Sequence, residues 1–156
     1  MKITTLCYIT CGERTLMLHR NKKENDENAG KWVGIGGKFE TGESPEDCLL
    51  REVFEETGIK LENYRFRGIV TFVSDEWGTE YMCLFTATVP EETLAYCTEG
   101  DLAWVENERL DSLPMWEGDR VFFDLIKKDR PFFSLKLTYK GDSLCSVTID
   151  GEEQGI

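Results

Sequence analysis

One short helix constrains this chain more than any other feature of its sequence. The segment 44–47, Ser-Pro-Glu-Asp, is a strong helix start, because serine serves as N-cap, proline suits the first helical position and acids favour the positive end of the helix dipole. Gly58 marks the end of the helix, since glycine readily adopts the left-handed conformation of a C-cap. The sequence therefore predicts a helix that begins after Ser44 and ends before Gly58.

Three glutamates lie close together on this helix. At about 100° per residue, Glu55 and Glu56 lie within about 60° of Glu52, one on either side. The opposite side is apolar and is expected to pack on a sheet. That side consists of Leu49, Leu50, Val53, Phe54 and Thr57.

Clustered carboxylates repel one another unless a cation compensates, since two unit charges about 4 Å apart repel by about 4 kcal/mol at an effective dielectric constant near 20. Oxygen ligands favour a hard ion, Mg²⁺ or Mn²⁺, over zinc, and magnesium prefers to share its coordination shell with substrate phosphates. A solvated helix face is the alternative for an ordinary pair of glutamates. Here a glycine loop precedes the helix, and Arg51 can pair with Glu43 to tie that loop to the helix. The cluster indicates phosphate-ester or anhydride chemistry.

Composition restricts the remaining possibilities. A chain of 156 residues predicts a single domain over 1–156, and no stretch of about 18 apolar residues predicts a membrane span. The start of the chain lacks the pattern of a secretory signal, so we expect a cytoplasmic protein with no membrane partner. A formal charge of −12 would repel long DNA or RNA, whereas a small phosphorylated ligand remains compatible with bound cations. The oligomeric state stays open.

The other elements are mostly strands. Strands are expected over 3–10, 15–20, 32–37, 64–74, 79–89, 102–105, 132–139 and 143–149, and a second helix over about 118–128. The polar loop 21–30 has nothing to bury. Six scattered cysteines without a C-x-x-C pair are expected to be mostly buried, reduced thiols, and a single histidine, His19, excludes a serine–histidine triad. Mixed strands with two helices predict an α/β (α+β) layered domain.

The stretch from Gly37 to Ile59 resembles the Nudix box, G-x5-E-x7-R-E-U-x-E-E-x-G-U, in which U is a bulky apolar residue. Every specified position is filled. The matching residues are Gly37, Glu43, Arg51, Glu52, Val53, Glu55, Glu56, Gly58 and Ile59. The resemblance implies the Nudix fold, a mixed β-sheet sandwiched between helices, and hydrolysis of a nucleoside diphosphate linked to another moiety.

The same resemblance implies a metal site and a catalytic group. The implied metal ligands are Gly36, Gly37, Glu52, Glu55, Glu56 and Glu99. Gly36 or Gly37 would contribute a backbone carbonyl, and Glu99 would contribute a carboxylate from a downstream loop, where simple solvation is the alternative. The implied catalytic residues are Arg51, Glu52 and Glu55, with the position of Glu52 proposed as the general base for water.

Nearly the whole chain is similar to the MutT-like branch of this family, particularly to hydrolases of oxidised purine nucleoside triphosphates such as 8-oxo-dGTP. That likeness implies attack of water on a nucleoside triphosphate, releasing the monophosphate and pyrophosphate. The candidate contacts to the nucleotide are Arg20, Val33, Lys38, Phe72, Trp116 and Asp119. Phe72 and Trp116 either stack on a base or are ordinary core aromatics.

Two positions depart from the oxidised-purine pattern. Val33 stands where that pattern has an asparagine that hydrogen-bonds the base, and Gly118 precedes Asp119 where a second aspartate is expected. The sequence therefore leaves the base and the sugar open. The alternatives are a Nudix pyrophosphatase for another nucleoside diphosphate-linked substrate and a non-catalytic nucleotide sensor. An RNA-cap hydrolase conflicts with the acidity of the chain.

Overall fold

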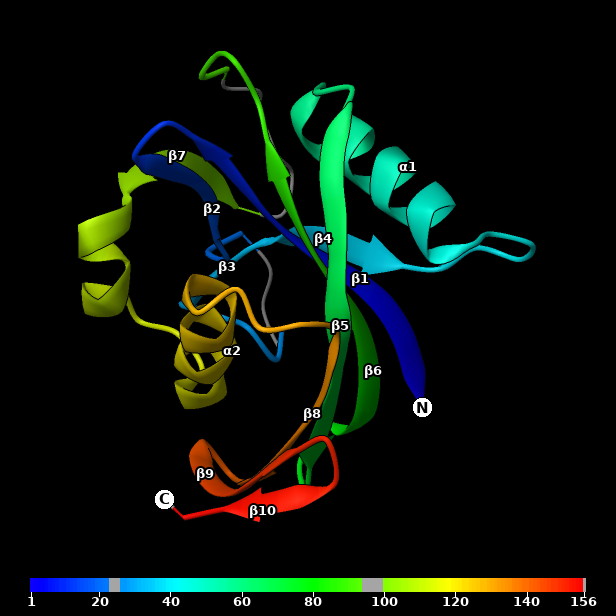
Figure 1. Cartoon of the computed structure of the whole chain (residues 1–156), viewed down its shortest axis with the longest axis vertical. Helices are drawn as coiled ribbons and strands as arrows, with labels where there is room; N and C mark the ends of the chain where they lie inside the picture. Colours follow the sequence, from blue (N-terminus) through cyan, green and yellow to red (C-terminus); the bar gives the residue numbers. More distant parts are fainter. Residues whose placement is uncertain (23–25, 94–99, 156) are drawn as a thin grey trace.

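A long mixed β-sheet runs through the molecule (Figure 1). The computed structural model describes residues 1–22, 26–93 and 100–155. The strands are β1 Lys2–Cys11, β2 Arg14–His19, β3 Trp32–Val33, β4 Ile35–Lys38, β5 Asn63–Ser74, β6 Gly78–Thr88, β7 Asp101–Glu106, β8 Phe133–Lys140, β9 Ser143–Ile149 and β10 Glu152–Gln154. Their order is β10-β9-β8-β5-β6-β1-β2-β3, with β4 also paired to β1 and β7 to β2. The pairs β1–β6 and β5–β8 are parallel, and the other pairs are antiparallel.

Helices cover both faces of the sheet. Helix α1, Pro45–Thr57, lies on one face, and the 3-10 helix η1, Asn107–Ser112, and helix α2, Glu117–Lys127, lie on the other (Figure 1). Each face has its own apolar core, one around Leu49 and Val53 of α1 and the other around Phe122 and Leu125 of α2. The structure confirms the predicted mixed sheet between helices.

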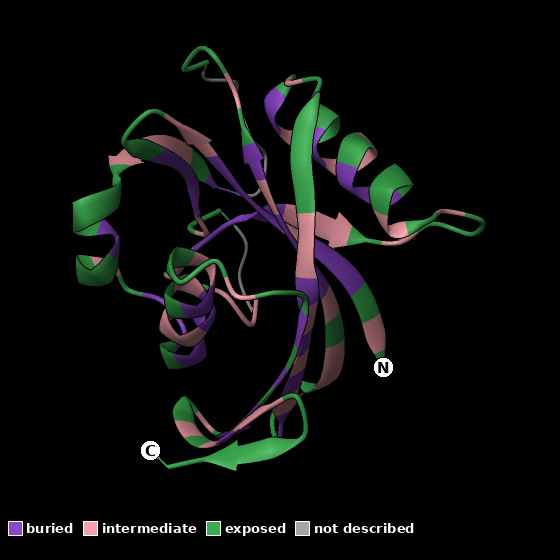
Figure 2. Ribbon diagram, viewed as in Figure 1, coloured by how far each residue is buried: buried purple, intermediate pink, exposed green. Residues whose placement is uncertain are grey.

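Strand β1 shows why the sheet needs a helix on each face. Much of β1 is coloured as buried in Figure 2. Its consecutive residues Cys7, Tyr8 and Ile9 are all buried, although neighbouring side chains of a strand point to opposite faces. Cys7 and Ile9 join the core on the α1 side, and Tyr8 joins the core on the α2 side. A strand that is buried on both faces reads as a continuous apolar run, as this one does.

The predicted ends of α1 are confirmed. Ser44 Oγ accepts a hydrogen bond from the Asp47 backbone N–H at 3.1 Å, and Asp47 Oδ2 accepts one from the Ser44 N–H at 3.1 Å, which completes a capping box. Gly58 closes the helix with a φ of 75°, in the left-handed region that favours glycine. These caps fix where α1 begins relative to the glycine loop before it.

The predicted inner face of α1 is wrong in part. Leu50 and Phe54 were expected to pack on the sheet, but they are 36% and 48% exposed. The residues that α1 does bury are Cys48, Leu49, Val53 and Thr57. The buried stripe is therefore shifted around the helix toward Glu52 and Glu56, which are half-buried. Contact with β4 and β1 sets this rotation, because the helix packs on these two strands.

The remaining strands and α2 match the expected segments, with a few differences. The segment 32–37 is two strands, because β3 pairs with β2 while β4 pairs with β1. The chain passes between these partners at Gly34, where a side chain would collide with the Cys7 carbonyl oxygen. Helix η1 and strand β10 were not expected. Cys7, Cys48 and Cys83 are buried free thiols as predicted, whereas Cys145 is exposed. In the described part of the chain, no helix is long and apolar enough to cross a bilayer.

Candidate active site

The glycines at the end of β4 allow close contact between the sheet and α1. A side chain at Gly36 would collide with the Thr5 carbonyl oxygen, and one at Gly37 would collide with the carboxylate of Glu52. The Glu52 carboxylate therefore lies directly against the backbone of Gly37, in space that only glycine leaves open. This contact joins the loop before α1 to the first of the three helix glutamates.

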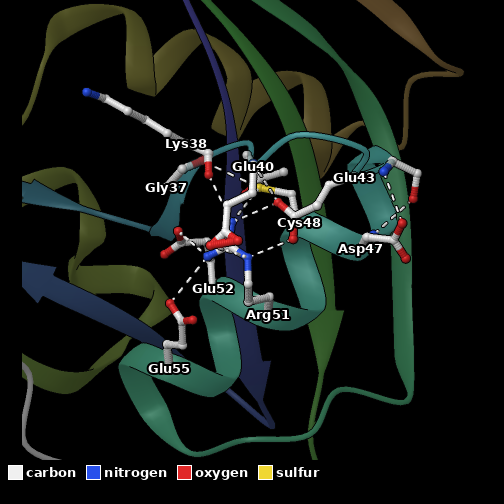
Figure 3. A network of polar contacts seen from close by, with 11 residues as sticks. Gly37, Lys38, Glu40, Glu43, Asp47, Cys48, Arg51, Glu52 and Glu55 are labelled. Carbon is white, nitrogen blue, oxygen red and sulfur yellow. Dashed lines mark hydrogen bonds and ion pairs between the residues drawn. The ribbon is translucent and has the colours of Figure 1, made fainter.

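Arg51 is the centre of an ionic network on α1 (Figure 3). Its Nε and Nη2 donate to the two carboxylate oxygens of Glu43 at 2.7 and 2.8 Å, which confirms the predicted pair in bidentate form. Its Nη1 donates to Glu52 Oε1 at 2.8 Å, and its Nη2 also donates to the Lys38 carbonyl oxygen at 3.0 Å. The hydrogen bonds from Arg51 lower the pKa of Glu43 to about 2, and Glu43 in turn raises the pKa of Arg51. One guanidinium thus fixes the loop and orients Glu52.

The three helix glutamates do not share one environment. Glu52 and Glu56 line a cleft, whereas Glu55 lies outside it with its side chain 55% exposed. Glu55 Oε2 lies 3.3 Å from Arg51 Nη1. Within the described ranges, no three carboxylate, histidine or cysteine side chains converge closely enough to hold an ion as they stand. Glu99, the downstream candidate ligand, lies outside the described residues.

The donors on the cleft nevertheless fit a hard divalent cation. Glu52 and Glu56 supply carboxylate oxygens, and Gly36 and Gly37 bring backbone to the same wall. Such oxygen donors suit Mg²⁺ or Mn²⁺, and magnesium completes its shell with water and phosphate oxygens rather than requiring an all-protein cage. Glu55 would join this set only by leaving Arg51.

The cleft has a volume of about 610 Å³, within the range of small-molecule sites. It brings together most of the residues that the sequence singled out. These are Arg20, Val33, Gly36, Gly37, Lys38, Glu52, Glu56, Phe72, Trp116 and Asp119. Arg51 and Glu55 do not line the cleft, and Arg51 contacts its lining through Glu52 and the carbonyl oxygen of Lys38.

Aromatic rings and one buried acid form the wall of the cleft near α2. The Trp116 ring meets the rings of Phe72 and Tyr139 edge-on, with centroids 5.1 and 4.8 Å apart. Asp119 lies in the first turn of α2 and is 8% exposed. Burial raises the pKa of Asp119 to about 8, against the opposing effect of the Arg120 and Lys31 charges. At neutral pH its carboxyl group is therefore mostly protonated.

Close packing against β8 explains why a glycine precedes Asp119. A side chain at Gly118 would collide with Leu137 and with the hydroxyl group of Tyr139, which project from β8. Tyr139 Oη instead accepts a hydrogen bond from the Gly118 backbone N–H at 2.6 Å. A second aspartate at this position would require the side chains of Leu137 and Tyr139 to shift.

The sequence missed the polar loop that borders the cleft. This loop was expected to bury nothing, but Asp26, Glu27 and Asn28 are half-buried and line the cleft, so that prediction was wrong. Asp26 Oδ2 accepts from Arg20 Nε at 2.8 Å, and Glu27 Oε1 accepts from Lys2 Nζ at 2.6 Å. Asn28 Oδ1 accepts from the indole N–H of Trp116 at 2.8 Å. The composition of the loop could not predict these contacts, because Glu27 and Asn28 bind residues far away in the chain.

Comparison with known proteins identifies the family of this chain. A model of the NUDIX domain matches residues 2–126. An uncharacterized Nudix hydrolase of Bacillus subtilis, YvcI, is 32% identical over 94% of this chain and 92% of its own length. An oxidized purine nucleoside triphosphate hydrolase of Danio rerio is 29% identical over 84% of this chain and 83% of its own. The crystal structure of a MutT protein from Bacillus halodurans superposes with a TM-score of 0.83, at 30% identity, covering 97% of this chain and 99% of that one. The chain therefore belongs to the NUDIX family, in its MutT-like branch, and is a hydrolase of diphosphate bonds.

Proposed function

We propose that the protein hydrolyses a purine nucleoside triphosphate to the monophosphate and pyrophosphate, and that oxidised purine nucleotides such as 8-oxo-dGTP are among its substrates. One observation carries this proposal: a single cleft of about 610 Å³ is lined both by Glu52 and Glu56 and by Trp116 and Asp119. Such a cleft can hold phosphates beside the carboxylates and a base beside the aromatic wall. The likeness to oxidized purine nucleoside triphosphate hydrolases of Danio rerio and Mus musculus supports the same substrate class.

The proposed reaction uses Mg²⁺ or Mn²⁺, held by Glu52, Glu56 and the backbone of Gly36 and Gly37. When bound, the cation supplies positive charge that stabilises the phosphoryl oxygens in the transition state. Glu52 accepts a proton from the attacking water, as general base. Arg51 keeps the Glu52 carboxylate in position through its 2.8 Å hydrogen bond. Glu55 is a candidate ligand for the same ion once it leaves Arg51.

The remaining cleft residues bind the nucleotide in this proposal. Lys38, which is exposed at the end of β4, contacts phosphate, and Arg20 does so in competition with Asp26. Phe72 and Trp116 form the apolar wall against the base. Asp119, with a pKa of about 8, presents a protonated carboxyl that both donates and accepts a hydrogen bond.

A panel of nucleotides tests the proposal. Purified protein with Mg²⁺ is given 8-oxo-dGTP, the ordinary purine and pyrimidine triphosphates and several nucleoside diphosphate-linked compounds, and pyrophosphate is measured separately from phosphate. Release of pyrophosphate from purine triphosphates is the expected result. Activity confined to a diphosphate-linked compound would point to another Nudix substrate. Binding without any turnover would indicate a nucleotide sensor and would overturn the proposal.

A further inference from the structure

A structured turn carries Asn28 to the edge of the cleft. The Arg20 N–H donates to the Lys31 carbonyl oxygen at 3.0 Å, and the Gly30 N–H donates to the Arg20 carbonyl oxygen at 2.7 Å. Within the turn, the Lys31 N–H donates to the Asn28 carbonyl oxygen at 2.9 Å. The backbone of Asn28 is therefore held against the end of β2, and its side chain starts from a defined position.

The Asn28 side chain has one fixed orientation. An indole N–H only donates hydrogen bonds, so the atom that faces Trp116 Nε1 at 2.8 Å must be the amide oxygen of Asn28. The amide nitrogen then points elsewhere, and among residues 1–22, 26–93 and 100–155 it has no hydrogen-bond partner. Asn28 lines the cleft, and its amide nitrogen keeps two donor protons that no described residue uses.

Trp116 is a rigid anchor for this amide. Lys31 Nζ lies 4.4 Å from the centre of the Trp116 ring, and the rings of Phe72 and Tyr139 pack against its edges. The Trp116 carbonyl oxygen also accepts a hydrogen bond from the Asp119 N–H at 3.0 Å. One residue thus positions both polar groups on this side of the cleft, the Asn28 amide and the Asp119 carboxyl.

We propose that Asn28 is a specificity-determining residue, whose amide nitrogen donates a hydrogen bond to an acceptor atom of the base and selects a 6-oxopurine over a 6-aminopurine. This inference rests on the proposed function. Val33 cannot supply such a contact, because its side chain is apolar. Asn28 therefore provides, from the loop, an amide that the strand position lacks.

The substituent at C6 of the purine is the group that Asn28 would distinguish. A 6-oxopurine presents an oxygen acceptor at C6, whereas a 6-aminopurine presents donor protons there. A donor that faces the Asn28 amide nitrogen would leave two donors opposed and unpaired in a partly desolvated site, which costs more than a missing contact. The protonated Asp119 adds a second donor to the same wall.

Two nucleotides that differ at C6 test the proposal directly. dITP and dATP both lack a 2-amino group, so with Mg²⁺ the ratio of their kcat/KM values reports the reading of the 6-position. Wild-type protein should prefer dITP. Asn28→Leu, of similar size, should lower kcat/KM for dITP about tenfold, mainly through KM, and should raise it for dATP, because the opposed donor is removed. Asn28→Asp should shift the ratio further toward dATP, because a carboxylate accepts from the amino group.

The same replacements at Asn63 are the matched controls. Asn63 is exposed at the start of β5 and lies outside the cleft, so Asn63→Leu and Asn63→Asp should leave both rates unchanged. Melting temperatures show whether each variant folds, and Asn28→Asp remains informative if the leucine variant does not. Equal losses for dITP and dATP in both Asn28 variants would mean that Asn28 only supports the loop, and would overturn the proposal. Absence of pyrophosphate release from any nucleoside triphosphate by wild-type protein would instead overturn the proposed function, and this inference with it.

Discussion

The two sides of the cleft are built in different ways. On the α1 side, Arg51 joins partners that are between 1 and 13 residues away in the chain, through ionic hydrogen bonds. On the α2 side, Asn28 and Trp116 are 88 residues apart, and Gly118 and Tyr139 are 21 apart. The contacts on the α1 side form within one loop and one helix. The contacts on the α2 side form only when the sheet brings distant parts of the chain together. In the proposed function, the α1 side binds the phosphates, and the α2 side, called the base-facing side below, contacts the base.

The largest effect is expected on the α1 side. Glu52→Gln or Glu56→Gln should lower kcat by at least about a hundredfold, because each removes a carboxylate whose charge supports the transition state. KM should change less. Steady-state pyrophosphate release from a responsive nucleotide is the measurement, with Glu46→Gln, an exposed glutamate of the same helix, as control. Near-normal turnover in both variants would contradict a catalytic role for this side of the cleft.

The local side of the cleft was also the predictable one. The N-cap Ser44, the C-cap Gly58 and the Arg51–Glu43 pair all follow from short spacings along one helix, and the structure confirms them. The rotation of α1 about its axis was less predictable. Leu50 and Phe54 are exposed, although the helical wheel placed them on the face that was expected to be buried. A wheel orders residues around a helix, but contact with strands from other parts of the chain selects which stripe is buried.

The base-facing side could be predicted only through family resemblance. Trp116, Phe72 and Asp119 were singled out in that way, and the cleft contains them. Asn28 was missed, because a polar residue in a loop looks solvated until its partner, 88 residues away, is known. The same limit explains Gly118, whose small size reflects Leu137 and Tyr139 of β8.

A smaller effect is expected on the base-facing side. Asp119→Ala should reduce discrimination between 8-oxo-dGTP and dGTP by about 1 to 3 kcal/mol in kcat/KM, because it removes a buried hydrogen-bonding group from the base wall. Turnover of poor substrates should survive, in contrast to the α1 variants. Unchanged selectivity would remove Asp119 from recognition.

The buried acid also predicts a dependence of stability on pH. The pKa of Asp119 is raised from 3.8 to about 8 in the folded protein, so folding favours its protonated form. Its contribution to stability is fully present below pH 3.8 and is lost as the pH rises toward 8. Asp119→Asn, which cannot ionise, should therefore gain in Tm relative to wild type across this interval. A constant difference in Tm would indicate that Asp119 is ionised in the fold.

The opposite pH dependence is expected for Glu43. Its pKa is lowered from 4.5 to about 2, so its contribution to stability is present above pH 4.5 and is lost as the pH falls toward 2. Glu43→Gln should lower Tm at pH 7, and the difference in Tm from wild type should close in acid. Thermal melts at several pH values, with the exposed Glu62→Gln as control, test the sign. A gap that persists at pH 2 would show that the ionic pair with Arg51 does not anchor the loop.

The smallest expected effect is a change in Tm when Mg²⁺ is added, which should depend on the α1 side of the cleft and not on the α2 side. Glu52 and Glu56 face the same cleft, so without a cation their charges repel each other more in the fold than in an extended chain. Free Mg²⁺ at ten times its Kd should stabilise the fold by about 1.4 kcal/mol, which raises Tm by a few degrees in a domain of this size. Glu56→Gln should raise the metal-free Tm and reduce the increase in Tm that magnesium produces, the opposition of stability and function that is typical of active sites.

The control is Asp119→Asn, which should keep the full increase in Tm with magnesium, because Asp119 belongs to the other wall of the cleft. If Glu56→Gln instead lowered the metal-free Tm and kept the whole gain, these carboxylates would be structural partners of nearby cations, and the two sides of the cleft would not differ in the way proposed.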